Sequence, residues 1–254
     1  SQGASADFFD GLFGRDDRPR MPTVGILNRS MGVPLGHGTT AKVKNYLAIV
    51  VANDSGRRGG GFAFVPYNQL AQKPQAYFTK VDRDTEKIRE GHGYGFFMQQ
   101  GRILVAVQTI YGLQIWDWTD IQNKNIRMLS DLTLPGVQED DYSLGAWWVF
   151  YQAPYIYVGG SSHGLYIVNA SNPERPFLVD RKGKPNPIPV TETGGFRVGP
   201  VYAAGNRLML SGNDAPGYSV LDISDPENPE VLSAHVSDIP KIYSSLFNGG
   251  LLLG

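Results

Sequence analysis

Short apolar runs alternate with turn residues along the whole chain, and this alternation repeats. A glycine precedes the most apolar run of each repeat, and these glycines lie 51, 52 and 53 residues apart, at Gly61, Gly112, Gly164 and Gly217. Five residues later stand Pro66, Asp117, Asn169 and Asp222, and seven residues later stand Asn68, Thr119, Ser171 and Ser224. Because several positions keep the same offset, the glycines mark a true repeat of four units, which we number 1 to 4.

The apolar runs of each unit predict short strands. One run precedes the glycine, at residues 46–51, 102–107, 155–158 and 207–210, and a second follows it. Unit 3 predicts four strands, at residues 146–151, 155–158, 165–169 and 177–180. The sequence has no segment with an apolar period of 3.6 residues over three turns, which excludes helical solenoids. A repeat of about fifty residues built from strands and turns is typical of a propeller blade.

The predicted fold class is therefore all-β. We expect a β-propeller of four-stranded blades, with about four complete blades in this chain and parts of others. Such a fold requires at least about fourteen strands arranged radially and no helix longer than about two turns.

The connection after the third strand has specific turn chemistry. Unit 3 carries Asn172-Pro173 at this connection, and unit 4 carries Asp225-Pro226. Asn or Asp before proline favours a turn, because its side chain accepts a hydrogen bond from the backbone ahead while proline presets φ.

The third strands and these turns carry a family resemblance. The strand reads Leu-Tyr-Ile-Val-Asn at 165–169 and Tyr-Ser-Val-Leu-Asp at 218–222, and a Ser-Asp-Pro-x-Asn-Pro turn follows at 224–229. In these features the chain resembles the LVIVD-repeat propellers, partially in unit 2 and poorly in unit 1, where Pro66 replaces the acid. The resemblance implies a bacterial propeller that is usually exported and seldom assigned an activity, so it identifies a scaffold.

The ends of the chain predict an incomplete ring. Residues 243–247 and 251–253 repeat the first two strands of a fifth blade, and residues 22–28 resemble an outer strand. Exposed apolar sheet edges are avoided, so we expect Leu253 to need a neighbour from outside this chain. The predicted division is an N-terminal arm at 1–21 and an incomplete propeller at 22–254 with a period of about 52 residues, the remainder being untraced, cleaved or in a separate chain. The alternative is a five-bladed ring, closed by these ends, that lacks one strand.

Composition removes several function classes. The chain has 23 Lys and Arg against 24 Asp and Glu, which argues against nucleic-acid binding because that requires clustered cations. The apolar runs are too short to span a bilayer, and the absence of cysteine excludes disulfides and thiolate metal sites. The chain opens at Ser1 without an initiator methionine, which predicts a periplasmic or extracellular protein after removal of a signal peptide, although a trimmed chain would look the same.

Candidate binding residues come from the loops that a propeller gathers at its channel mouth. These loops join each second strand to the third, or lead into each first strand, and long loops on one face are where such scaffolds carry function. The residues predicted for this binding face are Asn53, Arg57, Arg58, Tyr111, Asp140, Asp141, Asn213 and Asp214. The alternative is that these loops are polar only because they are exposed to water.

Histidine suggests a metal site on the same face. His37 and His92 stand in identical Gly-His-Gly triplets 55 residues apart, close to one repeat, and His163 lies in the adjoining loop of unit 3. Imidazoles from successive blades can bind copper or zinc. The alternative is a repeated turn in which each histidine bonds a neighbouring carbonyl. His235 falls on an outer strand and is predicted to be structural.

Two other clusters have more ordinary explanations. Glu139, Asp140 and Asp141 lack the ligand spacing of a calcium loop, which favours a solvated acidic turn. The tryptophans could form a sugar-stacking surface, but aromatic side chains on strands usually fill the space between blades, so we expect them in the core. They are Trp116, Trp118, Trp147 and Trp148.

Two function classes follow, and the sequence leaves open whether the protein is an enzyme. The favoured class is a noncatalytic binding or assembly module outside the cytoplasm, without a cofactor, that holds a protein or cell-surface partner through the channel-mouth face or the N-terminal arm. The alternative is a metal-dependent oxidoreductase that holds copper or zinc between His37 and His92.

Overall fold

The fold is given by a computed structural model, which describes residues 38–51, 60–70, 74–89, 94–99, 101–138, 141–236, 239–242, 246–248 and 251–253. This part of the chain contains twenty strands and only short helical turns. Both the strand number and the expected absence of long helices are confirmed for the described residues. The predicted N-terminal arm and the outer strand at 22–28 lie outside them, so the predicted division of the chain stays a prediction.

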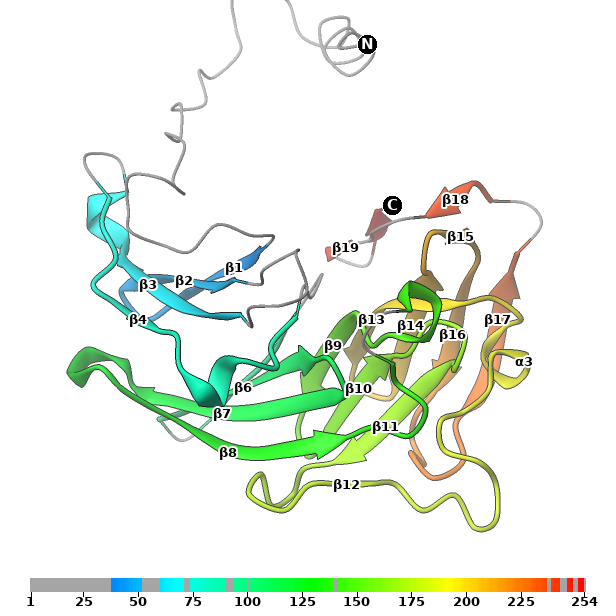
Figure 1. Cartoon of the computed structure of the whole chain (residues 1–254). Helices are drawn as coiled ribbons and strands as arrows, with labels where there is room; N and C mark the ends of the chain where they lie inside the picture. Colours follow the sequence, from blue (N-terminus) through cyan, green and yellow to red (C-terminus); the bar gives the residue numbers. More distant parts are fainter. Residues whose placement is uncertain are drawn as a thin grey trace, which may run out of the picture.

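Each unit forms one four-stranded antiparallel sheet, and the strands lie side by side in chain order (Figure 1). Units 1 and 2 consist of β1 (Gly38–Val43), β2 (Tyr46–Val51), β3 (Gly61–Pro66), β4 (Phe78–Lys80), β5 (Gly95–Gln99), β6 (Arg102–Thr109), β7 (Gly112–Asp120) and β8 (Asn125–Thr133). Units 3 and 4 consist of β9 (Trp148–Gln152), β10 (Tyr155–Gly159), β11 (Leu165–Asn169), β12 (Phe177–Leu178), β13 (Val198–Ala204), β14 (Arg207–Gly212), β16 (Tyr218–Asp222) and β17 (Glu230–His235).

Two small sheets and five helical turns complete the described structure. The strands β15 (Ala215–Pro216) and β18 (Lys241–Ile242) pair beside unit 4, and β19 (Leu246–Asn248) pairs with β20 (Leu251–Leu253). The helical turns are η1 (Tyr67–Gln69), η2 (Arg83–Thr85), η3 (Ile121–Asn123), η4 (Tyr142–Leu144) and α3 (Val190–Thr193). None of the helices in the described part of the chain has the length and apolar character that a bilayer crossing requires.

The predicted strand positions are close to the observed ones. The bounds agree for β2 and β11, while β6 and β14 each continue two residues further than predicted. In unit 3 the first strand begins at Trp148 rather than at Ala146, because the carbonyl of Trp147 accepts a hydrogen bond from Gln108 of unit 2 and belongs to the connection.

The hydrophobic core is divided among the spaces between successive sheets. Side chains of a strand alternate between its two faces, so each sheet supplies one face to the preceding unit and one to the following unit. On β6, Val105 and Val107 pack toward unit 1, whereas Leu104 and Ala106 pack toward unit 3. A third core joins units 3 and 4, where Ile167 packs with Leu210. The four sheets therefore follow one another around an arc (Figure 1), with the first strand β9 contacting both β5 and β13.

The tryptophans belong to this core, as the sequence predicted. Trp116 and Trp118 are fully buried between units 1 and 2, and Trp147 and Trp148 are at most 9% exposed. The ring of Phe62 meets both Trp116 and Trp118 edge to face, with centroids 4.9 and 5.0 Å apart. Edge-to-face packing suits the quadrupoles of the rings and excludes these indoles from stacking on a ligand.

The repeated glycines stand where a neighbouring backbone or ring approaches too closely for a side chain. A Cβ at Gly61 would lie 2.6 Å from the carbonyl oxygen of Lys80. At Gly112 and Gly164 it would collide with the carbonyl oxygens of Leu132 and Ile188. At Gly217 it would enter the ring of Phe196. The repeated glycine therefore reflects a steric requirement at the start of the third strand of each unit.

The repeated acid or amide after the third strand closes a turn in each unit that has one. Asp117 accepts a hydrogen bond from the backbone N–H of Thr119 at 2.9 Å, and Asn169 accepts from Ser171 at 2.9 Å. Asp222 accepts from Ser224 at 2.8 Å. Such side-chain turns are the local reason why Asp and Asn recur here. Unit 1 has Pro66 at this position, and its chain continues into the helical turn η1.

Candidate functional site

The candidate site is the face formed by the loops between second and third strands and by the connections that enter each first strand. We call it the loop face. In units 2 to 4 it includes residues 110–111, 160–164 and 213–217 together with the connecting residues 134–138, 141–147 and 179–197. The backbone already joins these loops, because the N–H of Ser162 donates to the carbonyl of Ser143 at 2.9 Å and that of Ser161 donates to Val198 at 2.8 Å.

Asn213 links the loops of units 3 and 4. Its side-chain oxygen accepts a hydrogen bond from the Tyr142 hydroxyl at 2.7 Å, and its side-chain nitrogen donates to the Ser161 hydroxyl at 2.8 Å. Asn213 and Ser161 are both fully buried. Buried polar groups need partners, and this amide has one on each side. Asn213 therefore lies beneath the loop face and holds Tyr142 in place from below.

Asp141 caps the helical turn η4. Its carboxylate accepts hydrogen bonds from the backbone N–H and the hydroxyl of Ser143, at 2.8 and 2.7 Å. These hydrogen bonds favour the charged form and hold the pKa of Asp141 below its ordinary value, with the nearby His163 contributing less. The carboxylate thus fixes the turn that presents Tyr142.

Asp214 fixes the neighbouring loop of unit 4. Its backbone has φ of 51°, and its carbonyl accepts a hydrogen bond from Arg197 at 3.1 Å. Its carboxylate pairs with Lys241 of β18 at 2.7 Å. Exposed ion pairs of this kind contribute little stability, so the pair orients the β15 to β18 region more than it strengthens it.

His163 is hydrogen bonded to the backbone. Its Nε2 lies 2.9 Å from the carbonyl oxygen of Gly136, and because a carbonyl only accepts, this nitrogen carries the proton. Nδ1 is then the nitrogen left for a metal. Within the described part of the chain, no group of three or more His, Asp or Glu residues is placed to hold a metal ion.

Six predicted site residues lie outside the described residues, and their roles stay predictions. They are His37, His92, Asn53, Arg57, Arg58 and Asp140. The predicted convergence of His37 and His92 is therefore neither supported nor opposed. Tyr111, by contrast, occupies the tight turn between β6 and β7 and is 44% exposed.

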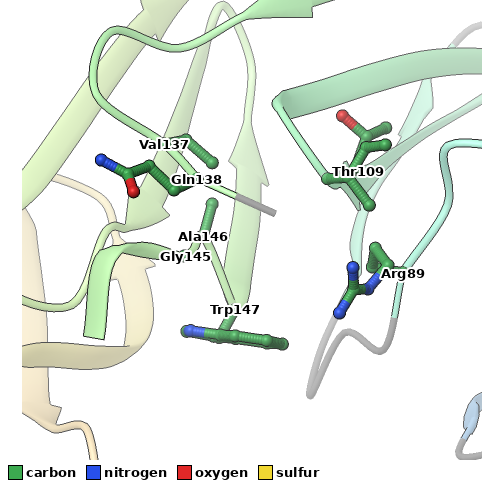
Figure 2. A pocket seen from close by; sticks show the side chains of 8 residues that line it. Arg89, Thr109, Val137, Gln138, Gly145, Ala146 and Trp147 are labelled. Atoms are coloured by element: carbon green, nitrogen blue, oxygen red, sulfur yellow. The ribbon is translucent and has the colours of Figure 1, made fainter. Parts of the chain in front are cut away.

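A pocket opens on the loop face between units 2 and 3, and sequence reasoning did not identify it. Its free volume is about 10 Å³, room for about one water molecule, and it is lined by Arg89, Thr109, Ile110, Val137, Gln138, Gly145, Ala146 and Trp147. Arg89 and Thr109 stand on the side of unit 2, opposite Val137, Gln138, Ala146 and Trp147 (Figure 2). The signal available in the sequence was Thr109 itself, which occupies the same repeat position as Ser161 and Asp214.

Hydrogen bonds between the two units hold the walls of this pocket. The side chain of Gln108 donates to the carbonyl of Trp147 at 2.8 Å, and the indole of Trp147 donates to the carbonyl of Tyr142 at 2.8 Å. The Thr109 hydroxyl is buried and has no hydrogen-bond partner among the described residues. A buried hydroxyl without a partner costs free energy, so a ligand group entering here would gain from meeting it.

Comparison with solved structures identifies the architecture. The periplasmic gluconolactonase PpgL of Pseudomonas aeruginosa superposes with a TM-score of 0.54 at 10% identity, over 84% of this chain and 60% of that protein. The β-propeller domain of Cps50 (Swd1) from Myceliophteria thermophila gives 0.53 at 11% identity, over 84% and 60%. The chain is a β-propeller. Its four sheets are four blades, as the sequence predicted.

The likeness ends at the fold. A hypothetical selenium-binding protein from Sulfolobus tokodaii also superposes, with a TM-score of 0.52 at 13% identity, over 83% of this chain and 51% of that protein. The propeller therefore spans between one half and three fifths of these three structures. No protein-family model and no curated protein matches the chain. The resemblance to the LVIVD-repeat propellers accordingly stays a prediction.

Proposed function

We propose that this propeller is a noncatalytic binding or assembly module, and that its loop face holds a protein or cell-surface partner. The observation that supports this proposal best is that polar side chains of that face are hydrogen bonded within the protein. Asn213, Asp141 and His163 each hydrogen bond inside the protein. They act as supports for the loops, and the loops they support carry exposed aromatic side chains.

Tyr111 and Tyr142 are the exposed aromatic residues of this face. They are 44% and 38% exposed, and Tyr142 is held by the buried amide of Asn213 and packs against Trp147 with ring centroids 5.0 Å apart. Tyrosine offers a large contact area at low conformational cost, and it is enriched at protein interfaces. A rigid loop face with fixed tyrosines is thus suited to binding another molecule.

The pocket between units 2 and 3 has room for a water molecule rather than for a partner side chain, so its contribution to the proposed interface would be a water-mediated contact. A water molecule bound there would reach the buried Thr109 hydroxyl and bridge it to a polar group of the partner. The N-terminal arm at 1–21 is the alternative binding surface of the proposal. Deletion of the arm would show whether the arm or the loop face holds the partner.

Photo-cross-linking in the producing cells tests the proposal. A photoreactive amino acid at Tyr111 is expected to capture a partner that the same residue at Phe177, 55% exposed on the outer strand β12, does not capture. With the partner purified, Tyr111→Ala and Tyr142→Ala should each weaken binding about tenfold or more, in the range of interface hot spots. Phe177→Ala is the matched control. Equal capture from both positions, or unchanged affinity in both tyrosine variants, would contradict binding through the loop face.

The metal alternative makes a separate prediction. Under our proposal, the purified protein contains copper and zinc well below one atom per chain by elemental analysis. Stoichiometric copper or zinc that is lost in His37→Ala and His92→Ala, and kept in His235→Ala, would instead support a metal-dependent oxidoreductase. His235 is a suitable control because it lies on β17, where its ring stacks on Tyr218 at 4.8 Å.

Location outside the cytoplasm is part of the same proposal. One of the solved propellers with this fold is a periplasmic protein. Fractionation of the producing cells, with detection of the protein by antibody, tests this placement directly. Recovery from the periplasm or the medium is expected.

A further inference from the structure

A second groove lies on the opposite side of unit 1 from the loop face. It is formed where the β1–β2 hairpin turn and the helical turn η1 meet the residue before β4. The groove has a volume of about 620 Å³ and is open to solvent, and its lining residues are Lys42, Asn45, Tyr46, Pro66, Tyr67, Asn68, Gln69 and Tyr77. Three tyrosines, one proline, three amides and a single lysine make this lining aromatic and polar at once, and no acid is among them.

One end of the groove is a fixed pair of aromatic rings. Tyr46 and Tyr77 stack with centroids 5.4 Å apart and an interplanar angle of 30°. The Tyr77 hydroxyl donates a hydrogen bond to the carbonyl of Gln122 in unit 2 at 2.9 Å, so this ring is held although it is 36% exposed. An exposed ring that is already ordered loses little entropy when a ligand binds.

The other end is Tyr67, whose ring is 47% exposed. The backbone N–H of Tyr67 donates to the carbonyl of Asn45 at 2.7 Å, which fixes this turn against the hairpin. Tyr67 is therefore the ring that offers a face to a ligand, because the ring of Tyr77 already has Tyr46 stacked on it and the ammonium of Lys124 over it.

Positive charge accompanies both aromatic ends. The ammonium of Lys42 lies 4.8 Å from the centroid of Tyr67, and that of Lys124 lies 4.8 Å from the centroid of Tyr77. The acid of the adjacent turn, Asp120, accepts hydrogen bonds from the side chains of Gln122 and Asn123 at 2.9 and 2.6 Å. These neutral donors leave the charge of Asp120 in place, but the two ammonium groups of Lys42 and Lys124 outweigh this one carboxylate, so the groove favours a ligand with negative charge.

The side chains between the two ends are amides. Asn45, Asn68 and Gln69 are exposed. Each amide offers two donors and one acceptor oxygen, a combination that can bind hydroxyl groups in either direction. Ring faces, amides and ammonium groups in one groove match a ligand that has rings, hydroxyls and carboxylates.

We propose that this groove binds a short acidic oligosaccharide, of the class built from uronic acids. Such a ligand would place a sugar face on Tyr67, hydroxyls on the amides and carboxylates near Lys42 and Lys124. A nucleic acid also stacks and carries negative charge, but its tighter charge spacing requires a more extensive cluster of cations than this near-neutral chain provides. The groove is remote from the loop face, so this inference stands independently of the partner proposed above.

Isothermal titration calorimetry with a tetramer of galacturonic acid tests the proposal, using the full chain at low salt. The fully methyl-esterified tetramer is the matched neutral probe, because it keeps the rings and most hydroxyls but loses the carboxylate charges. Tetragalacturonate is expected to bind several-fold tighter than the ester, and added salt should narrow the difference because it screens exposed charges. Tyr67→Ala should weaken binding about tenfold, and Lys42→Gln should weaken it less while reducing its salt dependence.

Phe177→Ala, at an exposed aromatic residue of the outer strand β12, is the control and should leave the saccharide affinity unchanged. Thermal unfolding checks the fold of each variant, and Lys42→Gln provides the test if Tyr67→Ala does not fold. Three results would overturn the proposal: no binding at millimolar tetramer, equal binding of the ester, or full affinity in both groove variants. Tight binding of a tetraglutamate peptide without binding of the saccharide would also overturn it, since the groove would then recognise an acidic peptide.

Discussion

Trp118→Ala is expected to lower the free energy of unfolding by about 3–5 kcal/mol, the usual range for a large aromatic side chain removed from a core. Trp118 is fully buried between units 1 and 2, and its ring meets Phe62 and Phe64 edge to face, both at 5.0 Å. The alanine variant would leave a cavity in the core between units 1 and 2, because the surrounding strands are fixed by their own hydrogen bonds. Urea unfolding followed by circular dichroism measures the change.

Trp118→Phe separates the loss of packing from the loss of the indole N–H. Nε1 of Trp118 is buried without a hydrogen-bond partner among the described residues, so its removal costs no hydrogen bond and relieves a desolvated donor. We therefore expect this variant to lose substantially less stability than Trp118→Ala. Tyr111→Ala, at an exposed turn, should change stability by no more than about 0.5 kcal/mol. A loss below about 1 kcal/mol for Trp118→Ala would contradict the assigned role of the indole.

Gly164→Ala is expected to destabilise the protein by about 4 kcal/mol or more, or to prevent folding. Gly164 has φ of +95°, and an added Cβ would collide with the carbonyl oxygen of Ile188. That oxygen accepts a hydrogen bond from the N–H of Leu165 at 3.0 Å, and the N–H of Ile188 returns one to Leu165 at 2.8 Å. Relief of the collision would break this pair of hydrogen bonds. The yield of folded protein and its thermal midpoint measure the effect.

Gly183→Ala is the matched control for the backbone angle. Gly183 has φ of +87°, and nothing lies within 4 Å of a Cβ built there. This variant therefore carries only the cost of a left-handed residue, about 1–2 kcal/mol. If Gly164→Ala were no more destabilising than Gly183→Ala, steric contact would not be the reason for the repeated glycine.

The fold was predictable because its repeat arises from interactions between residues of the same unit. The glycines at 61, 112, 164 and 217 mark a close approach, and Asp117, Asn169 and Asp222 each close a turn with the residue two positions ahead. Interactions over so few residues leave a signature at fixed offsets, so the period and most strand bounds could be derived. Burial of the tryptophans followed from their place on apolar strands.

The candidate site was only partly predictable. Tyr111 and Asp141 lie in the loops from which the binding face was predicted, and their part in binding stays a prediction. Asn213 is a buried link between Tyr142 and Ser161, which are 71 and 52 residues away from it in the chain. The pocket beside Thr109 and the groove of Tyr46, Tyr67 and Tyr77 were not expected at all. Their walls come from separate loops or separate units. The spacing of residues in the sequence does not indicate which of these loops come into contact.

The sequence by itself determined the all-β class, the four-unit period and the turn chemistry, because each depends on contacts within one unit. Only the tertiary structure decided which polar side chains hold the loops through hydrogen bonds inside the protein and which are exposed to solvent. That choice depends on how the loops of one unit meet those of the next. Asn213 and Tyr111 are both polar loop residues in the sequence, yet packing between units 3 and 4 buries Asn213 completely, while Tyr111 at the tip of a tight turn remains 44% exposed.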